Sequence, residues 1–274
     1  MLTHSVPGAL GLFLAAMVAG AVNSVAGGGS LISFPALVAF GQPAILANAT
    51  NTAALWPGSV ASAVAYRRQT SLHRGLLPAL LWPSVIGGLL GAYVLVSTPP
   101  ELFERVVPFL VLFATLLFAF RGRISSVFAP ANGRQPAGHD ETQSDRAAGA
   151  DEQVTRAGRV GGFLFQLLVA TYGGYFGAGI GILMLASLSL MGLRDIHRMN
   201  ALKTILGALI NVIAFVFFAV KGLVVWPLAV LMAAGAIAGG YVGARVAMRV
   251  DARWVGRFVI VVGLVVSVWL FASK

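Results

Sequence analysis

Residues 21–37 of the chain read AVNSVAGGGSLISFPAL, an uncharged run that is interrupted by the three consecutive glycines Gly27 to Gly29. The run lies inside a longer stretch without charge, from Gly8 to Ala65. A membrane-spanning helix takes about 20 apolar residues, with a range of about 17–25, so this stretch is too long for two simple helices. We predict a first helix over 8–26, a short segment over 31–40 and a helix over 44–65.

The composition places the chain in a lipid bilayer. Of its 274 residues, 58% are hydrophobic and only 10% are charged, and the mean hydropathy is +0.87. Soluble domains carry about 25% charged residues, because their surface must face water. The net charge of +10 comes from short basic clusters between apolar runs. That arrangement is typical of membrane anchoring and argues against nucleic acid as a partner. The chain has no cysteine, which excludes disulfides, thiolate metal sites and cysteine nucleophiles.

A cleaved signal peptide is the alternative for the first apolar run. Met1 to Pro7 contain no Lys or Arg, and the apolar run continues well past the length of a signal sequence. We therefore expect this run to stay in the protein as a membrane segment.

A polar segment divides the chain into two halves of similar size. Residues 121–158 hold five of the nine acidic residues among Gly, Pro, Ala and Gln, which predicts a flexible cytoplasmic linker between a first repeat over 1–120 and a second over 159–274. The remaining predicted segments are 75–97, 102–120, 160–175, a short one over 180–192, 200–220, 223–244 and 254–272. The fold expected is all-α: a polytopic transmembrane helical bundle of two homologous halves.

Three blocks recur in the same order in both halves, which indicates an internal duplication. The matched pairs are Gly27-x-Gly29 with Gly177-x-Gly179, Asn48–Thr52 with Asn200–Thr204, and Gly87–Ala92 with Gly239–Ala244.

The distribution of Lys and Arg predicts that the two halves have opposite orientations. The 67–74 loop is basic, whereas the equivalent turn of the second half has one basic residue, Lys221. The 97–101 turn has no Lys or Arg, whereas the equivalent loop at 245–253 is rich in Arg. Basic loops stay on the cytoplasmic side. The exchange of charge between equivalent loops therefore predicts an inverted repeat with glycine-broken half-helices and an odd number of crossings in each half.

The glycine breaks are the predicted centre of function. In lipid an unpaired backbone group costs several kcal/mol, so a break is tolerated only inside the protein or against a water-filled cavity. Half-helix N-termini carry free N–H groups and partial positive charge, which suit an anion. Paired breaks in two halves indicate a transporter binding site. Close helix packing is the alternative role of such glycines, and we favour it for Gly87, Gly88, Gly91, Gly239, Gly240 and Gly243.

Polar side chains near the breaks complete the candidate site. Lys203 begins an otherwise apolar helix, where a lysine is a functional candidate, although a lysine snorkelling to the headgroups is the alternative. The Asn and Thr residues either bind a ligand or cap helices. The predicted substrate-binding residues are Asn23, Ser24, Gly27, Gly28, Gly29, Asn48, Asn51, Thr52, Gly177, Gly179, Asn200, Lys203 and Thr204. No catalytic constellation, metal-ligand cluster or cofactor motif is recognisable, so no enzyme activity, metal or cofactor is expected.

The run Ala21–Leu37 resembles the opening signature of the sulfite exporter TauE/SafE family. Pro43-x4-Asn48-Ala49-Thr50-Asn51, Gly177-Ala178-Gly179 and Asn200–Lys203 are similar to that family's repeated pattern, and the likeness covers nearly all of the chain outside 121–158. The second motif departs from the first, since Leu185 stands near the place that Pro35 holds. The resemblance implies a multi-pass permease of the bacterial inner membrane, for sulfite or organosulfonate anions.

We therefore expect a secondary transporter of a small anion that has the lipid bilayer as its other partner. A transporter of another small solute, such as an organic acid or a metal ion, is the first alternative. A membrane assembly protein without transport activity is the second. The four acidic residues outside the linker all lie near the ends of predicted segments, and none lies in the middle of a span, which weighs against a metal ion or a cation carrier. The oligomeric state is open.

Overall fold

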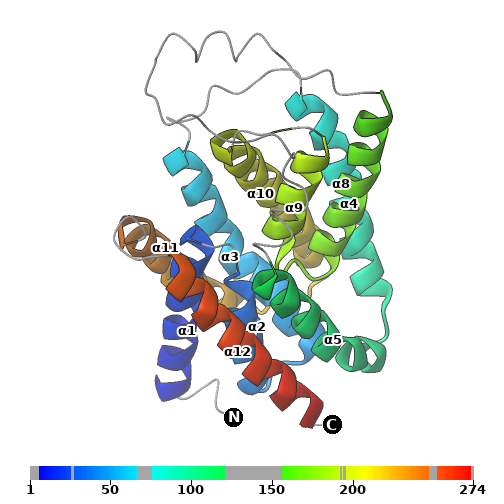
Figure 1. Ribbon diagram of the computed structural model, residues 1–274. Coiled ribbons are helices and arrows are strands. Elements are labelled where there is room, and N and C mark those ends of the chain that lie inside the picture. The colour runs from blue at the N-terminus through cyan, green and yellow to red at the C-terminus, as the bar shows by residue number, and fades with distance from the viewer. Residues whose placement is uncertain are drawn as a thin grey trace.

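The computed structural model describes residues 6–25, 28–66, 76–120, 156–191, 193, 196–246 and 252–272, and these form helices joined by short turns, with no strand among them (Figure 1). The first half contains α1 Val6–Val25, α2 Ser30–Ala39, α3 Ala44–Tyr66, α4 Leu76–Ser97 and α5 Pro100–Ala119. The second half contains α8 Arg156–Tyr175, α9 Ile180–Leu190, α10 Ile196–Val220, α11 Trp226–Val246 and α12 Ala252–Ala272. The predicted all-α bundle is confirmed. Of the linker predicted over 121–158, residues 121–155 lie outside the described residues.

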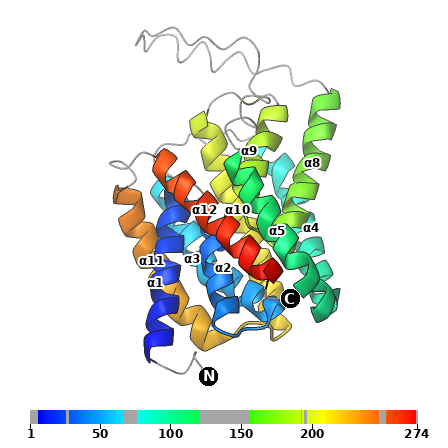
Figure 2. The ribbon, with the colours of Figure 1, turned by 60° about the horizontal axis from the view of Figure 1, so that its bottom comes forward.

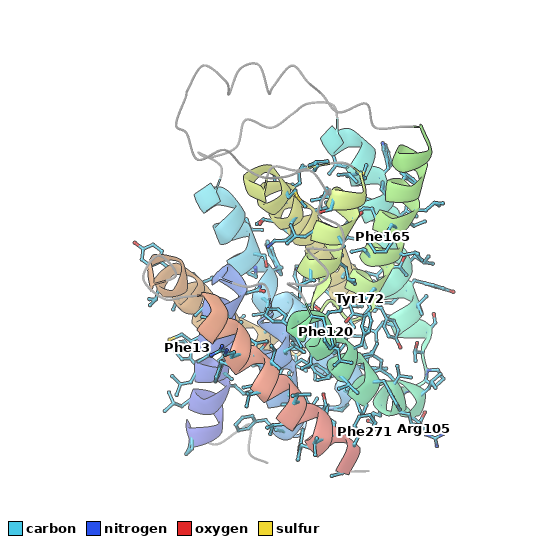
Figure 3. All side chains as sticks on the ribbon, in the orientation of Figure 1. Phe13, Arg105, Phe120, Phe165, Tyr172 and Phe271 are labelled. Atoms are coloured by element: carbon cyan, nitrogen blue, oxygen red, sulfur yellow. The ribbon has the colours of Figure 1, made fainter. Side chains whose placement is uncertain are left out.

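Several helices are suited to crossing a bilayer. Among the described residues, five helices are long and apolar enough, with spans at 80–97, 100–119, 202–220, 226–243 and 255–272. Their outer faces carry large apolar side chains such as Trp82, 68% exposed, and Val268, 67% exposed. Figure 3 shows that side chains project from the outside of the bundle along its helices. A soluble protein rarely exposes so much apolar surface, whereas lipid accommodates it.

Two helices begin earlier than the hydrophobic pattern predicts. The apolar run indicates starts near 160 and 200, but α8 begins at Arg156 and α10 at Ile196. Each additional turn contains basic residues, Arg156 and Arg159 in α8 and Arg198 in α10. A helix continues beyond the hydrocarbon into the headgroup region, where charged side chains remain solvated, so hydropathy alone places the starts too late.

Both glycine breaks occur where they are predicted. Helix α1 ends at Val25 and the short α2 begins at Ser30, while α8 ends at Tyr175 and the short α9 begins at Ile180. In each half the long helix packs against the short helix that follows it, so each pair forms a hairpin. The hairpin of α1 starts at the lower end of the bundle and that of α8 at the upper end (Figures 1 and 2).

Equivalent helices of the two halves make equivalent contacts. Helix α1 packs against α11 as α8 packs against α4, and α3 packs against α11 as α10 packs against α4. Helices α3 and α10 pack on each other, and so do α5 and α12. Such reciprocal pairs are what two halves related by a pseudo-two-fold axis produce.

The glycines of the recurring GGxxGA block allow the helices of these pairs to approach closely. A Cβ at Gly87 would lie 2.6 Å from the main-chain oxygen of Leu167 in α8, and Gly91 lies directly against the oxygen of Thr171. In the other half Gly239 lies against the oxygen of Met17 in α1. At these three positions the structure supports the packing role.

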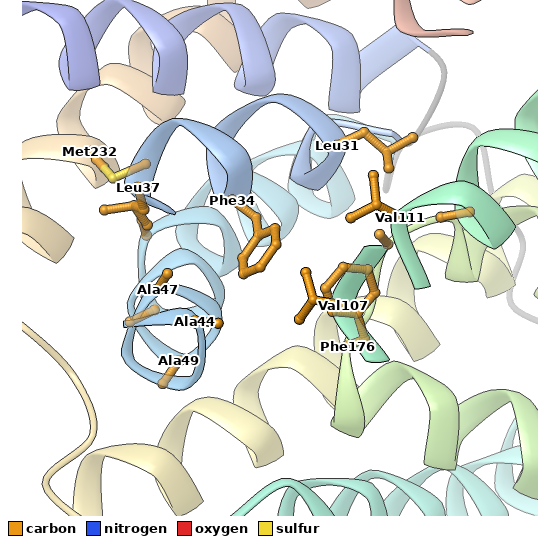
Figure 4. Close-up of a cluster of buried hydrophobic side chains, with 14 of the residues drawn as sticks. Leu31, Phe34, Leu37, Ala44, Ala47, Ala49, Val107, Val111, Phe176 and Met232 are labelled. Atoms are coloured by element: carbon orange, nitrogen blue, oxygen red, sulfur yellow. The ribbon is translucent and has the colours of Figure 1, made fainter. Parts of the chain in front are cut away.

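The main apolar core surrounds α2 in the middle of the bundle. Leu31, Phe34 and Leu37 are buried and pack with side chains of α3, α5 and the α8–α9 turn (Figure 4). The short helix is therefore enclosed by protein, as a broken segment at membrane depth requires.

Candidate functional site

The two glycine breaks lie against the same face of α5. A Cβ at Gly28 would lie 2.6 Å from Cε2 of Phe118, and a Cβ at Gly179 would lie 3.6 Å from the Cα of Ala114. Ala114 and Phe118 are one turn apart on α5, so they share a face. The N-terminal ends of α2 and α9, which come from different halves, therefore converge beside this helix.

Aromatic contacts join the two breaks. The rings of Phe34 in α2 and Phe176 in the α8–α9 turn meet edge to face, with centroids 5.3 Å apart (Figure 4). Tyr175 makes a similar contact with Phe103 of α5 at 5.6 Å. Edge-to-face pairs at these distances are favourable. The contact region between the halves is closed by aromatic side chains in this conformation.

The second break is held in one backbone conformation. Gly177 and Gly179 have φ angles of 78° and 76°, in the left-handed region that strongly favours glycine. The hydroxyl of Tyr172 donates a hydrogen bond to the main-chain oxygen of Ala178, 2.7 Å away. The turn is thus fixed both by its glycines and by a side chain of the preceding helix.

Main-chain N–H groups at the start of both short helices are hydrogen-bonded within their own turns. The N–H of Leu31 donates to the oxygen of Gly28 at 3.1 Å, and that of Ile32 to Gly29 at 2.9 Å. In the second half the N–H of Ile182 donates to Gly179 at 3.0 Å. An anion that used these particular groups would have to displace the glycine carbonyls.

Asn48 connects the halves. Its Nδ2 donates a hydrogen bond of 2.9 Å to the main-chain oxygen of Tyr175, the last residue of α8. The side chain is 1% exposed, and its Oδ1 has no hydrogen-bond partner among the described residues. A buried acceptor of this kind is costly unless a ligand or water binds it. Asn48 is therefore both a contact between the halves and a candidate ligand group.

Asn51 faces the short helix of its own half. The hydroxyl of Ser33 in α2 donates to Oδ1 of Asn51 at 2.5 Å, and the oxygen of Gly29 lies 3.2 Å from the same hydroxyl. Both side chains are buried. Thr52, by contrast, donates back to the main-chain oxygen of Asn48 within α3, at 2.9 Å. This last bond is of a common type in helices and does not itself indicate a ligand.

Lys203 occupies in the second half the position that Asn51 occupies in the first. Its Cδ lies 3.3 Å from where a Cβ would stand at Gly181, in the first turn of α9. The lysine is half-buried, like the neighbouring Thr204. Equivalent polar residues of α3 and α10 therefore each approach the short helix of their own half.

The remaining predicted residues are described only in part. The Cβ of Asn23 lies 3.2 Å from where a Cβ would stand at Gly29, so Asn23 adjoins the first break. Gly27 lies outside the described residues, and so do the side chains of Ser24 and Asn200.

Three residues of the region were missed in the sequence prediction. Ser33 lies four residues, or one helical turn, after Gly29. This spacing could have indicated that its hydroxyl lies close to the first break. Thr50, whose Oγ1 accepts a hydrogen bond of 3.0 Å from the N–H of Val225, lies within the recurring Asn block. Phe118 has no comparable signal, because an apolar side chain in an apolar helix does not reveal which glycine it covers.

Comparison with known proteins gives the family. The family model of the sulfite exporter TauE/SafE matches residues 12–270. The chain belongs to the TauE/SafE family. It is a membrane transporter of this type, and its helices make it a multi-pass membrane protein.

Curated relatives cover most of this TauE/SafE protein. It is 28% identical over 243 residues to a probable membrane transporter protein of Haemophilus influenzae, covering 86% of this chain and 84% of that protein. It is 28% identical to the probable membrane transporter protein ORF9 of a Sinorhizobium species, covering 96% and 92%. It is 25% identical to the probable membrane transporter protein YfcA of Escherichia coli K12, covering 93% and 87%. No solved structure matches the chain.

Proposed function

We propose that this TauE/SafE protein is a secondary permease that moves a small anion, sulfite or an organosulfonate, across the bacterial inner membrane. The observation that carries the proposal is the convergence of the breaks at Gly28 and Gly179 on one face of α5. A transporter site is expected where discontinuous helices from two repeats meet.

The groups around the breaks suit an anion. Lys203 supplies a positive charge in an otherwise apolar span, and Asn48, Asn51 and Ser33 supply amide and hydroxyl groups. No Asp or Glu occurs between Gly8 and Ala65 or between Arg159 and Leu193. An anion brought to the breaks would therefore meet no carboxylate of either hairpin, and the partial positive charge at the two half-helix N-termini would favour it.

The transport cycle proposed is a movement of one half against the other. The opposite starting ends of the α1 and α8 hairpins and the reciprocal helix pairs support an inverted repeat. In the conformation described here the Phe34–Phe176 contact joins the two breaks. Opening a path to the breaks requires this contact and the Asn48–Tyr175 hydrogen bond to separate.

The test is anion flux into liposomes that contain the purified, folded protein. Sulfite, an organosulfonate, sulfate, chloride and a small dicarboxylate are compared at equal concentration. We expect saturable uptake of sulfite or the sulfonate and none of chloride. Uptake of the dicarboxylate alone would show that the substrate is an organic acid and not a sulfur anion. Uptake of none of them, from protein that remains monodisperse, would contradict the anion permease.

A further inference from the structure

A second buried polar group lies away from the glycine breaks, where α4, α8 and α9 meet. Ser84, Gln166 and Ser187 are all 0% exposed. Nε2 of Gln166 donates a hydrogen bond of 3.0 Å to Oγ of Ser84. Oε1 of Gln166 and Oγ of Ser187 have no hydrogen-bond partner in the part of the chain that the structure describes. Two side chains of the group thus present unpartnered oxygens in a buried place.

The contacts between α8 and α9 fix how these two helices face each other. Near the outer end of the hairpin, Gly162 lies against the side chain of Met191. Near the break, Gly173 lies against the side chain of Ile180. The two helices run in opposite directions, so these contacts define one continuous seam.

Gln166 and Ser187 belong to this seam and lie at the same level. Gln166 is four residues after Gly162, and Ser187 is four residues before Met191. Residues four apart lie on the same face of a helix. The two unpartnered oxygens are therefore on facing sides of the hairpin, and Ser84 closes the group from α4.

The surroundings of this group are apolar. The buried side chains that pack nearby form one cluster of α4, α8, α9 and α10, which includes Leu80, Met184, Leu188 and Leu206. Polar atoms in such a setting are costly unless something binds them.

The fold itself does not require polar residues here. By the matched glycines, the positions equivalent to Gln166, Ser187 and Ser84 in the other half are Ala16, Leu37 and Ala236. All three are buried and apolar. The equivalent junction of α1, α2 and α11 therefore packs with apolar side chains at these positions, which points to a ligand where α8, α9 and α4 meet.

The two unpartnered oxygens, Oε1 of Gln166 and Oγ of Ser187, determine which class of ligand can bind. A carbonyl oxygen such as Oε1 repels an anion and attracts a cation or a hydrogen-bond donor. Neutral oxygens are ligands of hard cations. Because the group contains no carboxylate, a monovalent ion fits it better than a divalent one. We propose that Gln166 and Ser187 of the second half, together with Ser84 of α4, bind a dehydrated alkali cation, Na⁺ or K⁺.

The test measures cation binding directly, with no transported anion present. Purified protein in a choline buffer is titrated with ²²Na⁺, and separately with ⁸⁶Rb⁺ as the K⁺ analogue. We expect saturable binding of one of them, lost in Gln166→Leu and weakened at least tenfold in Ser187→Ala. Ser267→Ala is the matched control, because Ser267 is also buried but its hydroxyl donates to the oxygen of Gly263 at 2.7 Å. Its binding should equal that of the wild type.

Thermal unfolding provides a second readout. The Tm of the wild type should rise with the concentration of the bound cation, because a ligand of the folded state stabilises it. Both Gln166→Leu and Ser187→Ala should lose that rise. Ser187→Ala should keep at least the wild-type Tm in choline, since it removes only an unpartnered buried atom, whereas Gln166→Leu also removes the hydrogen bond to Ser84.

Absence of saturable binding of both cations to the folded wild type would overturn the proposal. Binding that survives unchanged in both variants would overturn it too, and would leave water as the occupant of the group. Since no anion and no flux enter the measurement, this outcome is separate from any failure of the permease assay.

Discussion

Asn48 of α3 donates a hydrogen bond of 2.9 Å to the main-chain oxygen of Tyr175, which ends α8 in the other half of the protein. The two residues are 127 positions apart in sequence. The bond ties the first half to the glycine break of the second. The movement of one half against the other that we propose for transport would break this bond.

Replacing Asn48 by Leu should therefore affect both stability and uptake. Loss of the bond should lower the free energy of unfolding by about 0.6 kcal/mol, and by about 1.7 kcal/mol at most, as for other hydrogen bonds between membrane helices. Initial rates of sulfite uptake in liposomes should fall, because the variant removes the amide that donates a hydrogen bond beside the second break. Thr98→Val removes an exposed hydrogen bond at the end of α4, to the main-chain oxygen of Val94, and should leave uptake unchanged. Unaltered uptake in Asn48→Leu would exclude Asn48 from the site.

Gly28→Ala should block the first break by displacing Phe118. The added Cβ would lie 2.6 Å from the aromatic ring, closer than carbon atoms approach each other. We expect uptake to fall strongly and to recover in part when Phe118→Leu is added. Gly161→Ala is the control, because nothing lies within 4 Å of the added atom there. Full activity of Gly28→Ala would show that the Phe118 contact is not needed.

Gly179→Ala should strain the second break. Its φ of 76° is left-handed, which costs a residue with a Cβ about 1–2 kcal/mol. Gly222→Ala has nearly the same φ, 70°, in the turn between α10 and α11, with open space around it. Both variants should lose similar stability in thermal unfolding, but only Gly179→Ala should slow uptake. Equal uptake in the two variants would assign Gly179 a purely structural role.

Lys203→Met should weaken anion binding. A charged hydrogen bond contributes about 1.5–3 kcal/mol, which corresponds to a rise in KM of roughly 10- to 100-fold. Lys221→Met is the control, since Lys221 is exposed in the turn between α10 and α11. The concentration dependence of uptake measures the effect. An unchanged KM would favour the snorkelling role.

The inverted repeat predicts where single cysteines can be labelled. The chain has no cysteine of its own, so each introduced one is the only target. Cysteines at Thr98 and Lys221 should react with a membrane-impermeant maleimide from the outside of cells. A cysteine at Asp251, in the loop equivalent to the 97–101 turn, should react only after the membrane is opened. Labelling of Thr98 and Asp251 from the same side would contradict the inversion.

The sequence predicted the breaks because charge-free runs and glycine clusters directly reflect the cost of bare backbone in lipid. It also indicated Asn51, through the block that recurs in both halves, and Lys203, through its charge in an apolar helix; their role in binding stays a prediction. It did not predict the hydrogen-bond partner of Asn48. That partner is a main-chain oxygen of the other half, and every residue has a main-chain oxygen, so no residue type in the sequence indicates it. The sequence analysis did not identify Gln166 and Ser187 as binding residues, for a related reason. Each is a single polar residue in an apolar helix, and only the register between α8 and α9 shows that they face each other.

The concentration dependence of ³⁵S-sulfite uptake into liposomes with and without the protein tests most directly whether a sulfite site lies between the two halves. We predict uptake that saturates, exceeds that of empty liposomes and is not inhibited by chloride. Uptake equal to that of empty liposomes, or a linear rise without saturation, would contradict a sulfite site between the two halves.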